Sequence, residues 1–74
     1  MDDRVVVDPA VMLGKPVIRG TRITVELLFE KLAAGESVQQ ILESYPFLSE
    51  ADLRAAFAFG AQTLRTVEGF PAAS

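Results

Sequence analysis

The chain lacks cysteine, histidine and tryptophan altogether. Without cysteine it can form no disulfide bond, thiolate metal site or cysteine nucleophile, and without histidine it can form no histidine triad or histidine metal site. Carboxylates, lysine and the single tyrosine are the acid–base groups that remain, and no two carboxylates stand out as a catalytic pair. We therefore expect a protein that is not an enzyme and that needs no metal or cofactor.

Long apolar runs are missing too. Val5-Val6-Val7 is too short for a membrane span or for the core of a signal peptide. The 74 residues, 50% of them hydrophobic, suit one small globular domain. We therefore expect a cytoplasmic protein, and its small core would gain stability from dimerisation.

Positive charge is scarce in the second half of the chain. The whole chain carries seven lysines and arginines against ten aspartates and glutamates. Residues 1–35 are balanced, whereas residues 36–74 carry two cations against five anions. Nucleic-acid-binding modules are usually basic, so this balance argues against strong nucleic-acid binding by a monomer and favours a basic protein partner.

The most informative stretch runs from Gly14 to Thr24 and reads Gly-Lys-Pro-Val-Ile-Arg-Gly-Thr-Arg-Ile-Thr. Pro16 favours extended backbone before it, and the two β-branched residues that follow suit a strand. Gly20 permits a turn with positive φ. The stretch therefore predicts a rigid β-arm ahead of the first helix.

Three cations, Lys15, Arg19 and Arg22, lie on this arm. One interpretation is structural, with Arg19 or Arg22 forming an ion pair with Asp8 or Glu26. The other is functional, with the arm contacting phosphates or an acidic partner. The residues alone leave both interpretations open.

Two short strands, Arg4–Val7 and Val17–Arg19, are predicted to pair as a hairpin. Between them, Ala10–Leu13 is predicted to form one helical turn that starts at Pro9 and ends at Gly14. An isolated hairpin is only marginally stable. We expect it to be covered by the helices or by the same strands of a second subunit.

Three helices are predicted, each opened by a hydroxyl side chain as its N-cap. They run from residue 25 to about 34, from 37 to 45 and from 49 to about 66. Their predicted N-caps are Thr24, Ser37 and Ser49. Gln40 and Asp52 complete capping boxes in the last two. Residues 1–66 therefore form the predicted domain, and residues 67–74 a flexible tail in which Phe70 is the only candidate anchor.

Apolar residues repeat at helical spacing on each helix. The predicted core faces are Val25, Leu28, Phe29 and Leu32, then Val38, Ile41 and Leu42, then Leu53, Phe57, Gly60, Ala61 and Leu64. Gly60 is costly inside a helix and indicates close packing. A second strip with Ala55 and Phe59 is predicted to point away from the core. Together with the strands it gives the predicted dimer or partner interface: Val5, Val7, Val17, Ala55 and Phe59.

The last two helices have the spacing of a helix-turn-helix motif, in which the third would be the recognition helix. Its start carries Glu50 and Asp52, and Arg54 is the only cation of its first two turns. Acidic side chains at this position argue against ordinary reading of the major groove.

Three groups of short motifs stand out in this chain. They are Gly14–Ile23; Ala34-Gly35-Glu36 with Ile41-Leu42, Tyr45-Pro46 and Leu48; and Asp52-Leu53 with Arg54-Ala55-Ala56. From about Val5 to Arg65 the chain resembles the bacterial and archaeal family called domain of unknown function 433. It departs from that family in two places, because many members carry a second glycine where Leu13 stands and because the tail here is short.

The resemblance implies a mostly α fold, a three-helix homeodomain-like helix-turn-helix with an N-terminal β-arm. It also implies an antitoxin of the VapB kind that binds and neutralises a PIN-like nuclease toxin, and a homodimer that could bind operator DNA. The residues predicted to contact toxin or nucleic acid are Lys15, Arg19, Thr21, Arg22 and Arg54. A stand-alone transcriptional regulator and a protein–protein adaptor remain as alternatives.

Overall fold

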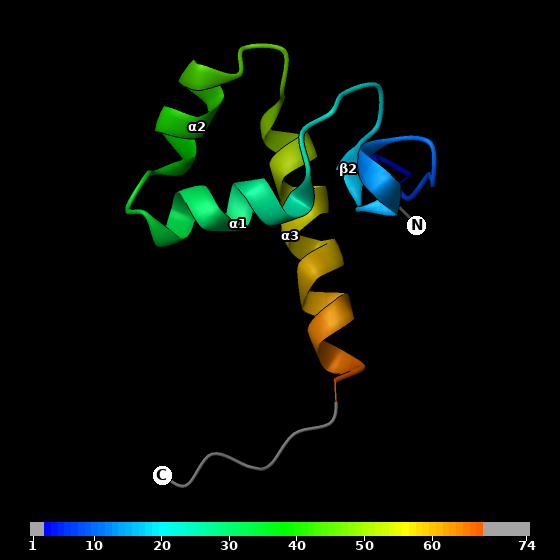
Figure 1. Ribbon diagram of the computed structural model, residues 1–74. Coiled ribbons are helices and arrows are strands. Elements are labelled where there is room, and N and C mark those ends of the chain that lie inside the picture. The colour runs from blue at the N-terminus through cyan, green and yellow to red at the C-terminus, as the bar shows by residue number, and fades with distance from the viewer. Residues whose placement is uncertain (1–2, 68–74) are drawn as a thin grey trace, which may run out of the picture.

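A short hairpin precedes three helices in the computed structural model, which describes residues 3–67 (Figure 1). The elements are β1 (Val5–Val6), the 3₁₀ turn η1 (Met12–Gly14), β2 (Val17–Ile18), α1 (Val25–Ala33), α2 (Val38–Ser44) and α3 (Glu50–Arg65). The predicted mostly helical fold with an N-terminal hairpin is confirmed. No helix in the described part of the chain combines the length and apolar character needed to cross a membrane.

The hairpin pairs as predicted, although its strands are shorter. β1 and β2 are antiparallel, with Val5 opposite Ile18 and Val6 opposite Val17. The far side of β2 is occupied as well, because Ile18 N–H donates to the carbonyl of Ile23 at 2.9 Å and Val17 forms a bridge with Thr24. β2 is therefore paired on both sides, and β1 is the edge of the sheet.

All three predicted N-caps are confirmed. The Thr24 hydroxyl accepts a hydrogen bond at 2.9 Å from the third main-chain N–H of α1. Ser37 and Ser49 each form a complete capping box, with Gln40 and Asp52 respectively. Each box satisfies two N–H groups that a helix start leaves without a partner inside the helix.

The core lies where the helices meet the hairpin. Its most deeply buried large side chains are Val17, Leu28, Ile41 and Leu53, each no more than 1% exposed. Val38 was predicted on the same face as Ile41 but is 38% exposed, because it is the first residue of α2 and lies outside the packed region.

The first half of α3 is packed on two sides, by α1 and by the hairpin. The prediction that Ala55 and Phe59 point away from the core is therefore wrong. Ala55 is only 7% exposed, and Phe59 is half-buried against the core cluster. The helical period shows one apolar face, but the hairpin supplies a second wall that the period does not reveal.

Gly60 permits close packing between α3 and α1, as predicted. A Cβ atom at this position would lie 2.5 Å from two ring atoms of Phe29. The Phe29 ring in turn meets Phe57 edge to face, with 5.4 Å between ring centroids. The glycine thus accommodates the aromatic pair that joins the two helices.

The second half of α3 extends beyond the body of the domain, as its orange part shows in Figure 1. Residues 61–65 are all exposed, and Leu64 retains 69% of its accessible surface. The prediction that Ala61 and Leu64 belong to the core is therefore wrong, because no element of the described chain packs over them and Leu64 only lines a groove beside α1. Residues 68–74 of the predicted tail, with Phe70, lie outside the described residues.

The loop between the strands also differs from its prediction. Ala10–Leu13 does not form a right-handed helical turn, because the Asp8 carboxylate accepts the Ala10 N–H at 2.9 Å and starts a different turn. The chain then enters η1 with φ of 49° at Met12 and 59° at Leu13. Few residues other than glycine adopt such left-handed backbone. The side chain of Leu13 is 94% exposed.

Candidate functional site

The turn that follows β2 holds the centre of the predicted arm in one conformation. Gly20 has a φ of +78°, which explains the glycine. The Thr21 hydroxyl donates to the Ile18 carbonyl at 2.8 Å and accepts from the Ile23 N–H at 3.0 Å. Thr21, a predicted contact residue, therefore has its hydroxyl committed to fastening the turn, and this fixes the backbone at Arg22.

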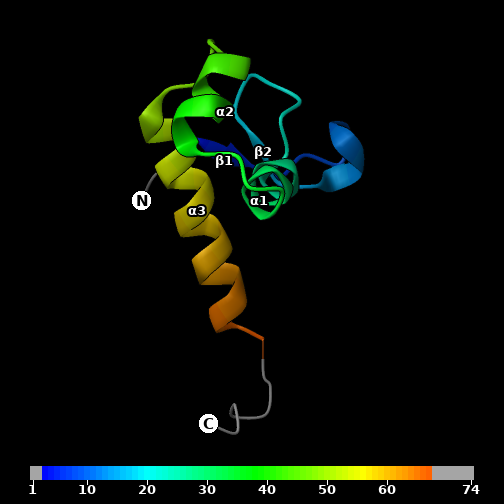
Figure 2. The same cartoon turned by 90° about the vertical axis from the view of Figure 1, so that its left-hand side faces the viewer.

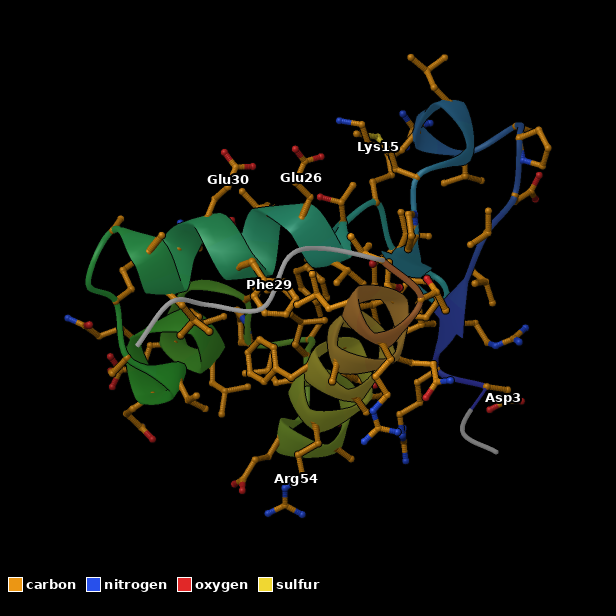
Figure 3. The ribbon with its side chains drawn as sticks, turned by 90° about the horizontal axis from the view of Figure 1, so that it is seen from below. Asp3, Lys15, Glu26, Phe29, Glu30 and Arg54 are labelled. Atoms are coloured by element: carbon orange, nitrogen blue, oxygen red, sulfur yellow. The ribbon has the colours of Figure 1, made fainter. Side chains whose placement is uncertain are left out.

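Lys15 is engaged inside the chain. Its Nζ donates to Glu26 Oε1 at 2.9 Å across the junction between the arm and α1 (Figure 3). This hydrogen bond and the negative charge of Glu26 raise the pKa of Lys15 above 10.5, and Glu30 adds a smaller contribution of the same sign. The structural interpretation offered Glu26 as a partner for an arginine, but Glu26 is bound by Lys15. Lys15 lies close to Glu26 because the carbonyl of Pro16 accepts the first N–H of α1 at 2.9 Å.

Arg19 is engaged as well, with the segment before β1. Its Nε donates to the main-chain oxygen of Asp3 at 2.8 Å, and one of its terminal nitrogens lies 3.9 Å from the Asp3 carboxylate. The structural interpretation offered Asp8 or Glu26 as the partner of Arg19, and Arg19 bonds to Asp3 instead. The hairpin register explains the difference, because it places Arg19 beside the start of β1.

Arg22 differs from the other two cations of the arm. It is exposed, and among residues 3–67 its side chain forms no ion pair or hydrogen bond. It lies at a groove of about 480 Å³ between the turn and the loop after β1, lined also by Val6, Asp8, Val11, Val17, Gly20 and Thr21. Asp8 shares this groove without pairing with Arg22. The arm thus presents one uncommitted guanidinium on a rigid turn.

Arg54, the last of the predicted binding residues, is not brought together with the arm. Figure 3 places Lys15 and Arg54 on opposite sides of the molecule. Arg54 donates to Glu50 at 2.7 Å, one helical turn earlier, and the Asp52 carboxylate is bound by the capping box and by Arg4 at 3.4 Å. The start of α3 therefore presents an arginine that is already paired with a carboxylate, beside further acidic side chains.

Two of the predicted interface residues are buried, and the other three lie at or near the surface. Val17 and Ala55 are buried within the chain's own core, at 1% and 7% exposure, so they offer no surface to a partner. Val5 and Val7 lie along the sheet edge, where Val7 is 58% exposed. Phe59 is half-buried and lines a shallow groove between α1 and the second half of α3.

Two surface features were missed by the sequence reasoning. One is the exposed apolar tip of the loop, Met12 and Leu13, and the departure from the resembled family at Leu13 was the available signal for it. The other is the groove of about 360 Å³ between α1 and α3, lined by Pro16, Val25, Glu26, Phe29, Phe59, Gly60, Thr63 and Leu64. Val25, Phe29, Gly60 and Leu64 of this lining were assigned to the core, because helical spacing does not show where the body of the domain ends.

The family described as "Protein of unknown function (DUF433)" matches residues 5–60, which include the hairpin, α1, α2 and the first half of α3. The chain therefore belongs to this family, and the resemblance inferred from its three motifs is confirmed. The match ends where α3 leaves the body of the domain.

Two further similarities support this assignment. A crystal structure of a DUF433 member protein from Anabaena variabilis superposes with a TM-score of 0.82 at 31% identity, covering 86% of this chain and 63% of that chain. "Uncharacterized protein y4eO" of Sinorhizobium fredii is 42% identical over 48 residues, which is 65% of this chain. The chain spans only 22% of the length of that relative.

Proposed function

We propose that this domain is a non-enzymatic, antitoxin-like binding module that holds a PIN-like nuclease toxin through its β-arm. The observation that carries the proposal is the state of Arg22, an exposed arginine without an ion pair among residues 3–67, on a turn that Thr21 fastens. A nuclease of this kind gathers carboxylates in its active site. A guanidinium can hold a carboxylate through two parallel hydrogen bonds.

The geometry of the arm supports Arg22 over Lys15 and Arg19 as the main contact. Lys15 and Arg19 would have to leave Glu26 and Asp3, respectively, before they could bind a partner. Arg22 has no such bond to break, and its backbone is already ordered. Both features lower the cost of association.

The decisive experiment is co-expression with the product of the adjacent open reading frame, followed by purification of the complex and a growth-rescue assay. Arg22→Ala should weaken the complex by about 2–5 kcal/mol, the usual cost of truncating a buried charged contact. Arg65→Ala is the matched control, because Arg65 is also exposed and unpaired in the described chain but lies at the far end of α3. It should change affinity by less than about 1 kcal/mol.

The same preparation tests the alternatives. If Glu50→Gln weakens the complex more than Arg22→Ala, the acidic start of α3 is the contact surface and the proposal for Arg22 is wrong. A stand-alone regulator would instead shift operator DNA in a salt-dependent manner without any toxin. The bond between Arg54 and Glu50 makes that second outcome the less expected one.

A further inference from the structure

The outer edge of β1 is a surface of the described chain that the proposed function leaves unused. In an antiparallel pair, alternate residues direct their N–H and C=O groups toward the neighbouring strand. The Arg4 carbonyl accepts the Arg19 N–H at 2.7 Å, and Val6 lies opposite Val17. Arg4 and Val6 therefore face β2, which leaves the main-chain groups of Val5 and Val7 directed outward.

No further strand covers that edge within residues 3–67, because the described sheet contains only β1 and β2. Figure 3 shows β1, in dark blue, at the right-hand margin of the molecule, with α3 and β2 on its inner side. Val7 is 58% exposed. An uncovered apolar edge strand is a template on which another strand can pair.

The strand is also complementary to itself. It reads Arg4-Val5-Val6-Val7-Asp8, with a cation at one end, an anion at the other and three valines between them. We propose that β1 pairs antiparallel with β1 of a second copy, across a two-fold axis at Val6. This pairing makes a four-stranded sheet in the order β2, β1, β1, β2 and places Arg4 opposite Asp8 of the second copy, twice.

The outward-facing residues select this register. Pairing centred on Val6 sets Val5 opposite Val7 of the second copy, so both outward-facing residues of each strand form hydrogen bonds. Pairing centred on Val7 sets Val5 opposite Pro9, which has no N–H to donate. Pairing centred on Val5 sets Asp8 opposite residue 2, so both of these registers separate Arg4 from Asp8. Opposite charges across neighbouring antiparallel strands are favourable, and a closed two-fold contact does not propagate into a fibre.

Both charged residues can take part while keeping their contacts inside the chain. The Asp8 carboxylate accepts the Ala10 N–H and forms no ion pair among the described residues, and its second oxygen can accept a guanidinium. The Arg4 side chain is 45% exposed while it contacts Asp52 at 3.4 Å. Its guanidinium carries five N–H donors and can contact more than one acceptor. The inference does not depend on toxin binding, since a regulator or an adaptor would pair in the same way.

Proline substitution tests the main-chain part of the proposal. Val7→Pro removes an outward N–H while leaving the hydrogen bonds between β1 and β2 in place. Val38→Pro is the matched control, because Val38 is 38% exposed and is the first residue of α2, where proline is tolerated. In sedimentation equilibrium at micromolar concentration, the wild type and Val38→Pro should have twice the 8.0 kDa mass of one chain, and Val7→Pro should have the mass of one chain.

Charge reversal tests the register independently. Arg4→Asp places aspartates at both ends of the strand and Asp8→Arg places arginines at both ends, so each variant should self-associate at least about tenfold more weakly than the wild type. An equimolar mixture should form a heterodimer, because every aspartate then faces an arginine. Circular dichroism of each variant checks that the helices are retained. The proposal is overturned by a monomeric wild type, by a Val7→Pro variant that remains a dimer with native helix content, or by a mixture that associates no better than the separate variants.

Discussion

Leu53 and Leu64 lie three helical turns apart on the same face of α3, yet Leu53 is 1% exposed and Leu64 is 69% exposed. The first half of the helix packs against both α1 and the hairpin. The second half projects past them, as Figure 2 shows. The two leucines have similar local sequence and different neighbours. Helical spacing therefore identifies the face of a helix, and the length of the neighbouring elements decides how much of that face is covered.

The largest expected effect tests this contrast directly. Leu53→Ala removes a fully buried side chain and should lower the free energy of unfolding by about 2–5 kcal/mol. Leu64→Ala should change it by less than about 0.5 kcal/mol, because the side chain already contacts solvent. Chemical denaturation at submicromolar concentration, where an association equilibrium contributes least, measures both values. Equal losses for the two variants would mean that something covers the second half of α3 in solution.

Local hydrogen bonding explains which parts of the fold were predictable. Thr24, Ser37 and Ser49 define their helix starts with partners that are three residues away, so the sequence contains both members of each interaction. The burial of Ala55 and the exposure of Leu64 depend instead on where the hairpin and α1 pack along α3, and both elements lie far away in the chain. Their environments follow from tertiary packing and are absent from any single helical pattern.

The boundary between the two halves of α3 gives the second prediction. Gly60→Ala should gain about 1 kcal/mol of helix propensity, but its Cβ must displace the Phe29 ring at a cost of about 1–3 kcal/mol. We therefore expect Gly60→Ala to lower the melting temperature in a thermal unfolding experiment. In a Phe29→Leu background the same substitution should become neutral or stabilising, because the ring that it meets is gone. A stabilising effect in the wild-type background would place the Phe29 ring elsewhere.

The candidate site was only partly predictable, for an equally physical reason. The sequence identified the arm and its three cations, and the turn at Gly20 follows from residue type alone. Which cation stays uncommitted depends on the hairpin register, which brings Arg19 to Asp3, and on the docking of α1, which brings Glu26 to Lys15. These contacts join residues 11 and 16 positions apart, so spacing could not assign them.

A third leucine sharpens the comparison with a smaller effect of opposite sign. Leu13 is 94% exposed, more than the 69% of Leu64, and its φ of 59° adds backbone strain. Leu13→Gly removes a penalty of about 1–2 kcal/mol and adds about 0.5–1 kcal/mol of unfolded-state entropy, so stability should rise by a few tenths to about 1 kcal/mol. The melting temperature of Leu13→Gly beside Leu64→Gly measures the difference. Leu64→Gly should destabilise, since it places glycine inside a helix.

The smallest expected effect concerns an exposed ion pair. Lys15 and Glu26 are more than half exposed, so their contact should contribute little to stability although it raises the pKa of Lys15 above 10.5. Because the folded-state pKa is the higher one, the stabilisation is complete below pH 10.5 and is lost as the pH rises through the folded-state pKa of Lys15. Glu26→Gln should lower the Lys15 pKa in an NMR titration and leave that of Lys31, which Glu36 raises, unchanged. The free energy of unfolding, measured below and above pH 10.5, should then decrease slightly more with rising pH for the wild type than for Glu26→Gln. A large difference between them would show that this surface contact matters to stability as much as a buried one.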